Sequence, residues 1–194
     1  MNKYIIASHN PNKVKEMQLR LRNISLISLK DIGYQDTIIE SGISLKENAL
    51  IKARCIYEKY NLPCISDDTG LEVDALNGEP GVFSARYAGI NSDSNHNIDK
   101  LLSKLRGVKM RSARFRTVIC LKNLQGDMFF EGVVEGVITN KKNGSGGFGY
   151  DPIFKPNGFN QTFSQMSLEK KNKVSHRGLA LEKLISYLNY SVVE

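Results

Sequence analysis

The alternation of apolar and polar positions along the chain predicts strands and helices that follow one another. Apolar runs at residues 4–7 and 64–66, with a weaker run at 26–29, are typical of strands. Helical spacing appears at Val14, Met17 and Leu21, and again along residues 45–60. This pattern predicts an open α/β sheet with flanking helices.

The second half of the chain predicts a long hairpin between two helices. Apolar and polar residues alternate over 115–121, a turn follows at 125–127, and a second arm runs over 128–139. Gly132 and Gly136 in that arm predict bulges or bends. Residues 92–94 have the side chains to cap a helix over 98–105, and Leu181, Leu184 and Leu188 mark a last helix.

Length and charge narrow the class of protein. With 194 residues and 41% hydrophobic content, the chain predicts one domain over residues 1–194. The formal net charge of +7 favours an anionic partner, either nucleic acid or a small polyphosphate. Because the basic residues are spread along the whole chain, a small ligand is favoured and no stable nucleic-acid partner is expected.

The cysteines and the apolar runs indicate where the protein works. Cys55, Cys64 and Cys120 form no CxxC pair, which favours packing roles over disulfides or zinc. The first apolar run is too short for a signal peptide, and no run approaches twenty residues. We therefore expect a soluble cytoplasmic protein with no membrane partner.

Two adjacent carboxylates, Asp67 and Asp68, follow the apolar run at 64–66 and precede Thr69 and Gly70. Ligands of open α/β sheets bind just beyond the carboxyl ends of strands, where an acid pair holds a metal or moves a proton. The same residue types are ordinary turn formers. The stretch alone therefore fits either a strand-ending turn or a chemical centre.

The first loop offers an anion site at a helix N-terminus. Asn10 is a suitable N-cap and Pro11 suits the first helical position, so Ser8, Asn10 and Lys13 lie near free backbone N–H groups. A capped helix with a solvated lysine fits equally well. Lys52, on the next predicted helix, also reads as solvent-facing on local pattern alone.

The run 144–149 matches G-x-G-x-x-G but lacks the context of a dinucleotide site. That motif must open a helix, and Pro152 stands where the helix would need its first turns. No Lys-Ser or Lys-Thr pair follows, which excludes a Walker A loop. The backbone is instead free to approach a ligand, with Phe148 and Tyr150 available to stack on a flat ring, although a plain glycine-rich hairpin loop is the alternative.

Six motifs in order resemble the inosine triphosphate pyrophosphatase family: residues 8–13, 47–53, 66–71, 80–87, 146–152 and 175–178. The resemblance runs from about Ile5 to Leu188. It implies hydrolysis of ITP, dITP and XTP to the nucleoside monophosphate and pyrophosphate, which removes these nucleotides before incorporation into DNA or RNA. It also implies an elongated α/β fold with a twisted mixed sheet, two lobes around a central cleft, and a homodimer.

The resemblance also assigns roles to residues. Asp68 would be the base for the attacking water, and Asp68 and Glu40 would bind Mg²⁺. The substrate contacts would be Ser8, Asn10, Lys13, Lys52 and Thr69, and the purine would be held by Phe148, Gly149, Tyr150, Asp151, Lys171, His176 and Arg177. By charge alone, Asp67 would raise the proton affinity of Asp68, whereas bound Mg²⁺ would lower it, and the sequence fits either outcome. His9 departs from the family pattern, in which many members have glycine.

Overall fold

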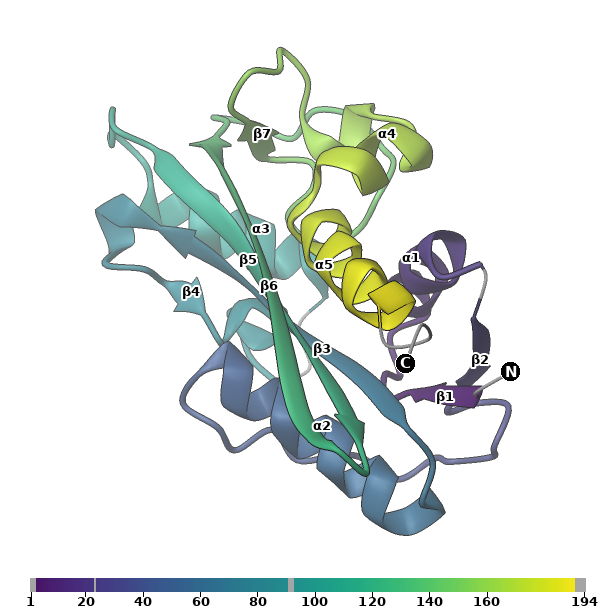
Figure 1. Cartoon of the computed structure of the whole chain (residues 1–194). Helices are drawn as coiled ribbons and strands as arrows, with labels where there is room; N and C mark the ends of the chain where they lie inside the picture. The colour runs from purple at the N-terminus through teal and green to yellow at the C-terminus, as the bar shows by residue number, and fades with distance from the viewer. Residues whose placement is uncertain (1–2, 23, 91–92, 191–194) are drawn as a thin grey trace. The chain divides into compact units, whose positions relative to one another are not determined.

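The structure is a computed structural model that describes residues 3–22, 24–90 and 93–190 (Figure 1). Strands and helices alternate through the first half and a hairpin dominates the middle. The strands are β1 (Lys3–Ile6), β2 (Ser25–Ser28), β3 (Cys64–Val73), β4 (Pro80–Gly81), β5 (Ser112–Asn123), β6 (Gly126–Ile138) and β7 (Phe154–Pro156). The helices are α1 (Pro11–Arg20), α2 (Leu45–Tyr60), α3 (Ser94–Lys104), α4 (Leu168–Val174) and α5 (His176–Tyr190).

The strands form a mixed sheet in the order β2-β1-β3-β5-β6-β7, with β4 paired to β3. β1 is parallel to β2 and to β3, whereas β4 and β7 are antiparallel to their neighbours. The predicted α/β class with a mixed sheet and flanking helices is confirmed. The single-domain organisation and the two-lobed shape with a central cleft stay predictions.

Two compact units divide the chain. The first comprises Met1–Asp68, Thr117–Gly132 and Arg177–Glu194, and the second comprises Thr69–Arg116 and Val133–His176. β3, β5 and β6 each begin in one unit and continue into the other. Each unit therefore has its own core although neither is a continuous stretch of sequence.

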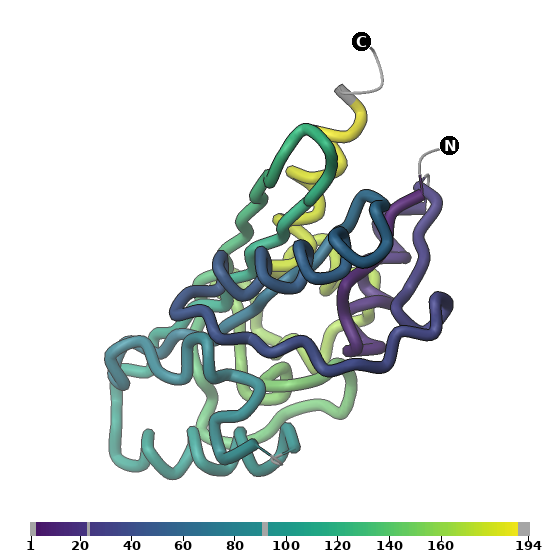
Figure 2. Tube along the Cα trace, turned by 90° about the horizontal axis from the view of Figure 1, so that it is seen from below, coloured from purple at the N-terminus to yellow at the C-terminus, as the bar shows by residue number. Residues whose placement is uncertain are grey.

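In the first unit, helices cover both faces of the sheet. Ile119 and Leu121 of β5 pack with Met17 of α1 and with Leu184 of α5. Cys120, which points to the opposite face, packs with Ala49 and Ala53 of α2. Figure 2 accordingly has α2 beside the β5–β6 hairpin. The alternation along β5 thus fixes which helix lies on which face.

The core of the second unit is rich in aromatic side chains. Phe115 contacts Phe154 with ring centroids 4.7 Å apart, and Phe163 lies 5.2 Å from Phe154. Gly136 of β6 pairs with Pro156 of β7, and a Cβ at Gly136 would come within 3.0 Å of the Pro156 Cα. The close approach of β7 is therefore the reason for this glycine.

Helix ends follow the local chemistry of the sequence. The Asn10 side chain caps α1, as predicted, and the Ser44 side chain caps α2 by accepting the Glu47 N–H. Asp93 caps α3; Ser92, the other candidate in the predicted cap, lies outside the described residues. No helix among the described residues is long and apolar enough to cross a membrane.

Candidate active site

The two adjacent carboxylates lie inside a strand, not beyond its end. β3 continues from Cys64 through both residues to Val73, so the prediction of a strand-ending turn is wrong. Asp67 and Asp68 are only 1% and 7% exposed. Cationic side chains from distant parts of the chain pair with both carboxylates, so the strand continues without leaving a buried charge uncompensated.

Asp67 is the centre of a buried ion-pair network. Arg177 Nε and Nη2 donate to Asp67 Oδ2 at 3.1 and 2.9 Å, and Lys13 Nζ lies 3.1 Å from the same oxygen. Glu16 Oε2 accepts from Arg177 Nη1 at 2.5 Å. Burial raises the pKa of Asp67, but Lys13 and Arg177 outweigh burial and hold the pKa below its ordinary value. Asp67 is therefore an ionised structural anchor.

Lys52 joins the two carboxylates that the resemblance assigns to the metal. Its Nζ lies 3.2 Å from Asp68 Oδ1 and also donates to Glu40 Oε1. Burial opposes the charge on Lys52, but Asp68 and Glu40 prevail and raise its pKa. The prediction of a solvent-facing lysine is wrong, since Lys52 is 8% exposed. Both carboxylates thus converge on one cationic atom.

The two carboxylate oxygens of Asp68 differ in their contacts. Its Oδ2 is buried and has no hydrogen-bond partner among the described residues. Its pKa is raised chiefly by burial, with Glu40 and Asp67 adding to the effect and Lys52 and Lys13 opposing it. Repulsion from Asp67, the cause expected from the sequence, is therefore secondary to burial.

The residues present fit a hard divalent cation. Glu40 and Asp68 supply carboxylate oxygens within reach of a common point, and Mg²⁺ binds through one or two carboxylates while keeping several waters. No group of three or more His, Cys, Asp or Glu side chains gathers as a metal site in the part of the chain that the structure describes. Two carboxylates are therefore the donors that the described residues offer, a number that Mg²⁺ accepts when water supplies its other ligands.

The first loop brings the predicted phosphate contacts to the same unit. Ser8 Oγ accepts from the Asn10 N–H at 3.2 Å, and Asn10 Oδ1 accepts from the N–H groups of Asn12 and Lys13 at 3.0 and 3.3 Å. Burial, assisted by Lys52 and Arg177, lowers the pKa of Lys13, although Asp67 opposes this. The alternative of a solvated lysine fails here as well, because only 16% of the Lys13 side chain is exposed.

The second unit contains most of the predicted purine contacts. Asp151 accepts from the Phe148 N–H at 2.8 Å and from Lys171 Nζ at 2.6 Å, and Lys171 Nζ also lies 4.5 Å from the centre of the Phe148 ring. Gly147 has φ +72°, and a Cβ there would lie 2.9 Å from Asp151 Cγ. No helix starts within 144–149, in agreement with the rejection of a dinucleotide site.

Contacts within the second unit hold Tyr150 and His176 in place. The Tyr150 hydroxyl donates to the Ser84 carbonyl at 2.9 Å, and the His176 ring stacks on Phe115 with centroids 4.5 Å apart. Both residues are buried, whereas Phe148, Gly149 and Thr69 are half-buried. Among the predicted purine contacts, Phe148 therefore has the most accessible ring for stacking on a flat ligand.

Arg177 and α4 differ most from what the sequence suggests. Arg177 lies with Asp67 and Glu16 in the first unit, whereas the other residues predicted to hold the purine lie in the second. α4 was not predicted, because a lysine run is typical of a solvated face. Lys171 and Asn172 on this helix are nevertheless buried. Glu16 was also missed, and its place within the first helix offered no local signal.

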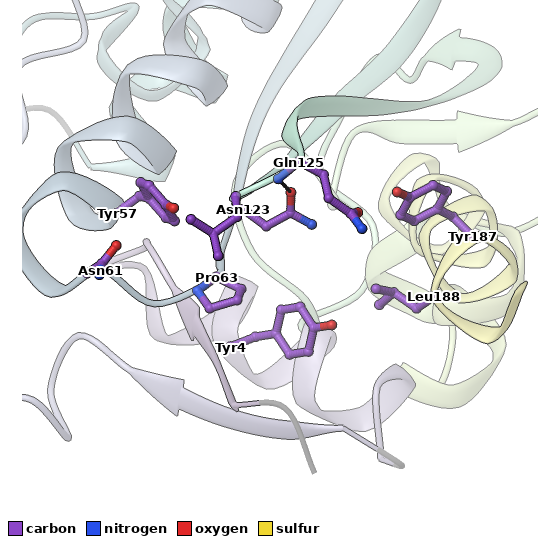
Figure 3. Close-up of a pocket in the computed structure, with 9 residues that line it drawn as sticks. Tyr4, Tyr57, Asn61, Pro63, Asn123, Gln125, Tyr187 and Leu188 are labelled. Atoms are coloured by element: carbon purple, nitrogen blue, oxygen red, sulfur yellow. Dashed lines mark hydrogen bonds between the residues drawn. The ribbon is translucent and has the colours of Figure 1, made fainter. Parts of the chain in front are cut away.

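A separate hollow of about 260 Å³ lies elsewhere in the first unit (Figure 3). Its lining comprises Tyr4, Tyr57, Asn61, Pro63, Asn123, Leu124, Gln125, Tyr187 and Leu188. None of the predicted site residues is among them, and the described lining carries no charged side chain. The hollow therefore takes no part in the chemistry considered for the carboxylates.

Comparison with known proteins confirms the resemblance inferred from the motifs. Residues 4–187 match the Ham1 family. The dITP/XTP pyrophosphatases of Flavobacterium johnsoniae and Porphyromonas gingivalis are 49% and 46% identical; they are matched over 96% and 97% of this chain, and over 97% and 98% of their own lengths. The solved structure of the Staphylococcus aureus Ham1 protein has 38% identity and a TM-score of 0.89, with 98% of this chain and 100% of that chain covered. On both sequence and fold, the chain belongs to the Ham1 family.

Proposed function

We propose that this protein is a Mg²⁺-dependent pyrophosphatase that converts dITP, ITP and XTP to the nucleoside monophosphate and pyrophosphate. The names of the relatives support the reaction, since they are dITP/XTP pyrophosphatases. The observation that carries the proposal is the convergence of Glu40 and Asp68 on Lys52 Nζ, with Asp67 and Lys13 alongside. This arrangement combines carboxylates for a cation with lysines for a polyphosphate.

The first unit supplies the groups for phosphate chemistry. A nucleoside triphosphate carries about four negative charges, which must be offset before a nucleophile approaches phosphorus. Lys13 and Lys52 would bind phosphate oxygens, and Ser8 and Asn10 would orient the loop at the N-terminus of α1. When bound to Glu40 and Asp68, Mg²⁺ would supply a further positive charge and polarise a water.

Asp68 would accept the proton of the attacking water. Its Oδ2 is buried without a partner among the described residues, and its raised pKa makes it a better proton acceptor than an exposed aspartate. Lys52 Nζ would exchange its carboxylate contacts for a phosphate oxygen as the substrate binds. Asp67, held by Arg177, would keep Lys13 in place rather than take part in proton transfer.

The second unit supplies the groups for base recognition. Lys171 and His176 are candidate donors to the six-oxo group of hypoxanthine or xanthine, with Phe148 stacking on the ring. A donor aimed at an oxygen is left unpaired when the amine of adenine takes its place, which disfavours ATP by ~10⁴-fold. Gly149, Tyr150 and Asp151 would shape the loop, and Thr69 would contact the substrate from β3.

A panel of nucleotides tests the proposal. Pyrophosphate release is measured from ITP, dITP, XTP, ATP and GTP, with and without Mg²⁺. We expect rapid release from the first three only, and only with the metal. Equal turnover of all five would refute the specificity, orthophosphate as the first product would refute the bond cleaved, and salt-dependent RNA or DNA binding without turnover would favour a nucleic-acid module.

The homodimer and the cytoplasmic location implied by the resemblance belong to the same proposal. Light scattering coupled to size-exclusion chromatography measures the first, with the mass expected at twice that of one chain. Fluorescence microscopy of a tagged protein tests the second.

A further inference from the structure

The segment that carries Glu40 has little apolar packing on the side that leads into α2. Between Tyr34 and the start of α2 at Leu45, the chain forms neither helix nor strand. Two of its apolar side chains point into solvent, since Ile39 is 77% exposed and Ile43 is 87% exposed. Ile38, two residues before Glu40, is partly buried against the core of the first unit, so polar contacts are needed to hold the stretch after Glu40.

Asn48 supplies one of these contacts from the first turn of α2. It is fully buried, and its Oδ1 accepts the Gly42 N–H at 2.8 Å. Glu47 Oε2 adds a second contact by accepting the Ile43 N–H at 2.8 Å. The carboxylate therefore bonds the residue before the N-cap rather than the cap itself. The two side chains fix the chain just after Glu40.

Gly42 lies too close to α2 to carry a side chain. A Cβ at this position would lie 2.6 Å from Glu47 Cβ and 2.8 Å from Asn48 Oδ1. Any larger residue would therefore push the segment away from α2. The absence of a side chain at Gly42 is what allows its N–H to reach the Asn48 amide.

The same face of α2 contacts the Glu40 side chain and the backbone two residues after it. Lys52 lies one helical turn after Asn48, and its Nζ bonds the Glu40 carboxylate. Burying Asn48 also costs free energy, because its Nδ2 has no hydrogen-bond partner among the described residues. An apolar side chain of similar size would avoid that cost, so the bond to Gly42 is the feature that an asparagine adds here.

We propose that Asn48 is a positioning residue that fixes the Glu40 carboxylate for the divalent cation. The inference rests on the proposed function, because it assumes that Glu40 is a metal ligand. In other proteins, residues that hold a metal-binding side chain in place without touching the metal contribute roughly 10- to 100-fold to metal affinity. We expect an effect in that range here.

The test compares Asn48→Ala with a matched control, Asn97→Ala. Asn97 is also buried, accepts the Ala88 N–H at 2.7 Å and donates to the Ala85 carbonyl at 3.0 Å, but it lies in the second unit. Mn²⁺ binding is measured by electron paramagnetic resonance of the free ion, without nucleotide. Thermal unfolding is followed by circular dichroism.

We expect Asn48→Ala to weaken Mn²⁺ binding by roughly 10- to 100-fold. It should raise the Mg²⁺ concentration for half-maximal ITP turnover by a similar factor and leave kcat near normal once Mg²⁺ saturates. Asn97→Ala should lower the unfolding temperature without changing either metal measurement. Equal Mn²⁺ affinity in the wild type and Asn48→Ala, with ITP turnover intact, would overturn the role of Asn48 but leave the proposed function standing. A wild type that binds no Mn²⁺ and needs no Mg²⁺ would overturn the proposed function as well.

A second variant keeps the test decisive if Asn48→Ala does not fold. Gly42→Ala leaves the core of α2 intact and removes the same contact from the loop side. We expect it to weaken Mn²⁺ binding to a similar extent, because it breaks the same contact. When Asn48→Ala does fold, the double variant should bind Mn²⁺ no more weakly than the worse single variant. Additive losses, or normal binding in Gly42→Ala, would contradict the role of Asn48.

Discussion

Adjacent residues of one strand have opposite surroundings in this protein. Asp67 points to Arg177 and Lys13. Asp68 points to Lys52, and its second carboxylate oxygen has no hydrogen-bond partner among the described residues. The side-chain period of a strand produces this difference, because successive residues face opposite sides. Asp67 is therefore ionised and fixed, whereas Asp68 has the oxygen that the proposed role as base requires.

Asp68→Asn and Asp67→Asn should consequently fail in different ways. We expect Asp68→Asn to fold normally and to lose ~10²- to 10⁴-fold in kcat for ITP, since an amide accepts no proton. Asp67→Asn should lower the free energy of unfolding by ~3–5 kcal/mol, because it leaves Arg177 and Lys13 without their buried partner. Pyrophosphate release and urea unfolding measure the two effects. Near-normal turnover in folded Asp68→Asn would transfer the role of base to another group.

The contact between Asp151 and Lys171 depends on the absence of a side chain at Gly147. Its positive φ and the nearby Asp151 carboxylate leave no space for a Cβ, so Gly147→Ala should displace Asp151 from Lys171. We expect KM for ITP to rise ~10-fold or more, with a smaller change in kcat, because the loss falls on binding. Gly158→Ala is the control: Gly158 also has a positive φ, of +80°, but nothing lies within 4 Å. Equal effects of the two variants would point to backbone strain alone.

At the scale of elements, one helix cap lies among the residues that are predicted to bind phosphate. Asn10 caps α1 beside the phosphate contacts, and Asp93 caps α3 by accepting the His96 N–H at 2.9 Å. Both caps satisfy backbone N–H groups that the helix itself cannot pair. The two helices differ in that only α1 starts at the candidate site.

Substituting the two caps should separate these roles. Asn10→Ala and Asp93→Ala should each lower the free energy of unfolding by ~1 kcal/mol. Only Asn10→Ala should also raise KM for ITP, because its loop carries Ser8 and Lys13, which are proposed to bind phosphate. Urea unfolding and ITP kinetics test both variants. An unchanged KM in Asn10→Ala would confine Asn10 to capping.

Elements that depend on local chemistry were predictable from the sequence, and those that depend on distant partners were not. The caps at Asn10 and Ser44 and the β5–β6 hairpin follow from neighbouring residues. The continuation of β3 through Asp67 depends on Arg177, whose distance along the chain no local pattern reveals. The burial of Lys171 likewise depends on Asp151 and Phe148. Most of the fold was therefore readable, but the partners of the buried charges were not.

At the scale of the whole molecule, the net charge of +7 does not come from the cations of the candidate site, because carboxylates balance them there. Lys13, Lys52, Lys171 and Arg177 are paired with carboxylates, and the last three are buried. Buried pairs are screened less by salt than exposed charges. Substrate affinity should therefore depend only weakly on ionic strength.

Salt dependence distinguishes this enzyme from a nucleic-acid binder. We expect KM for ITP to change by no more than ~3-fold between about 50 and 200 mM KCl at fixed Mg²⁺, because the lysines proposed to bind phosphate are largely shielded from solvent ions. A protein that binds nucleic acid through many exposed lysines would lose ~10³- to 10⁵-fold in affinity over that range. Steady-state kinetics with ITP, paired with a filter-binding assay on RNA, measures both quantities.

Because the first unit takes its chain from Met1–Asp68, Thr117–Gly132 and Arg177–Glu194, its core cannot close during synthesis until the last helix has left the ribosome. Leu181 and Leu184 of α5 are buried against Met17 and Ile65, which emerge far earlier. Until then, the apolar faces of α1 and β3 remain uncovered and open to aggregation. The same interleaving means that no single cut of the gene separates the two units into independently folding pieces.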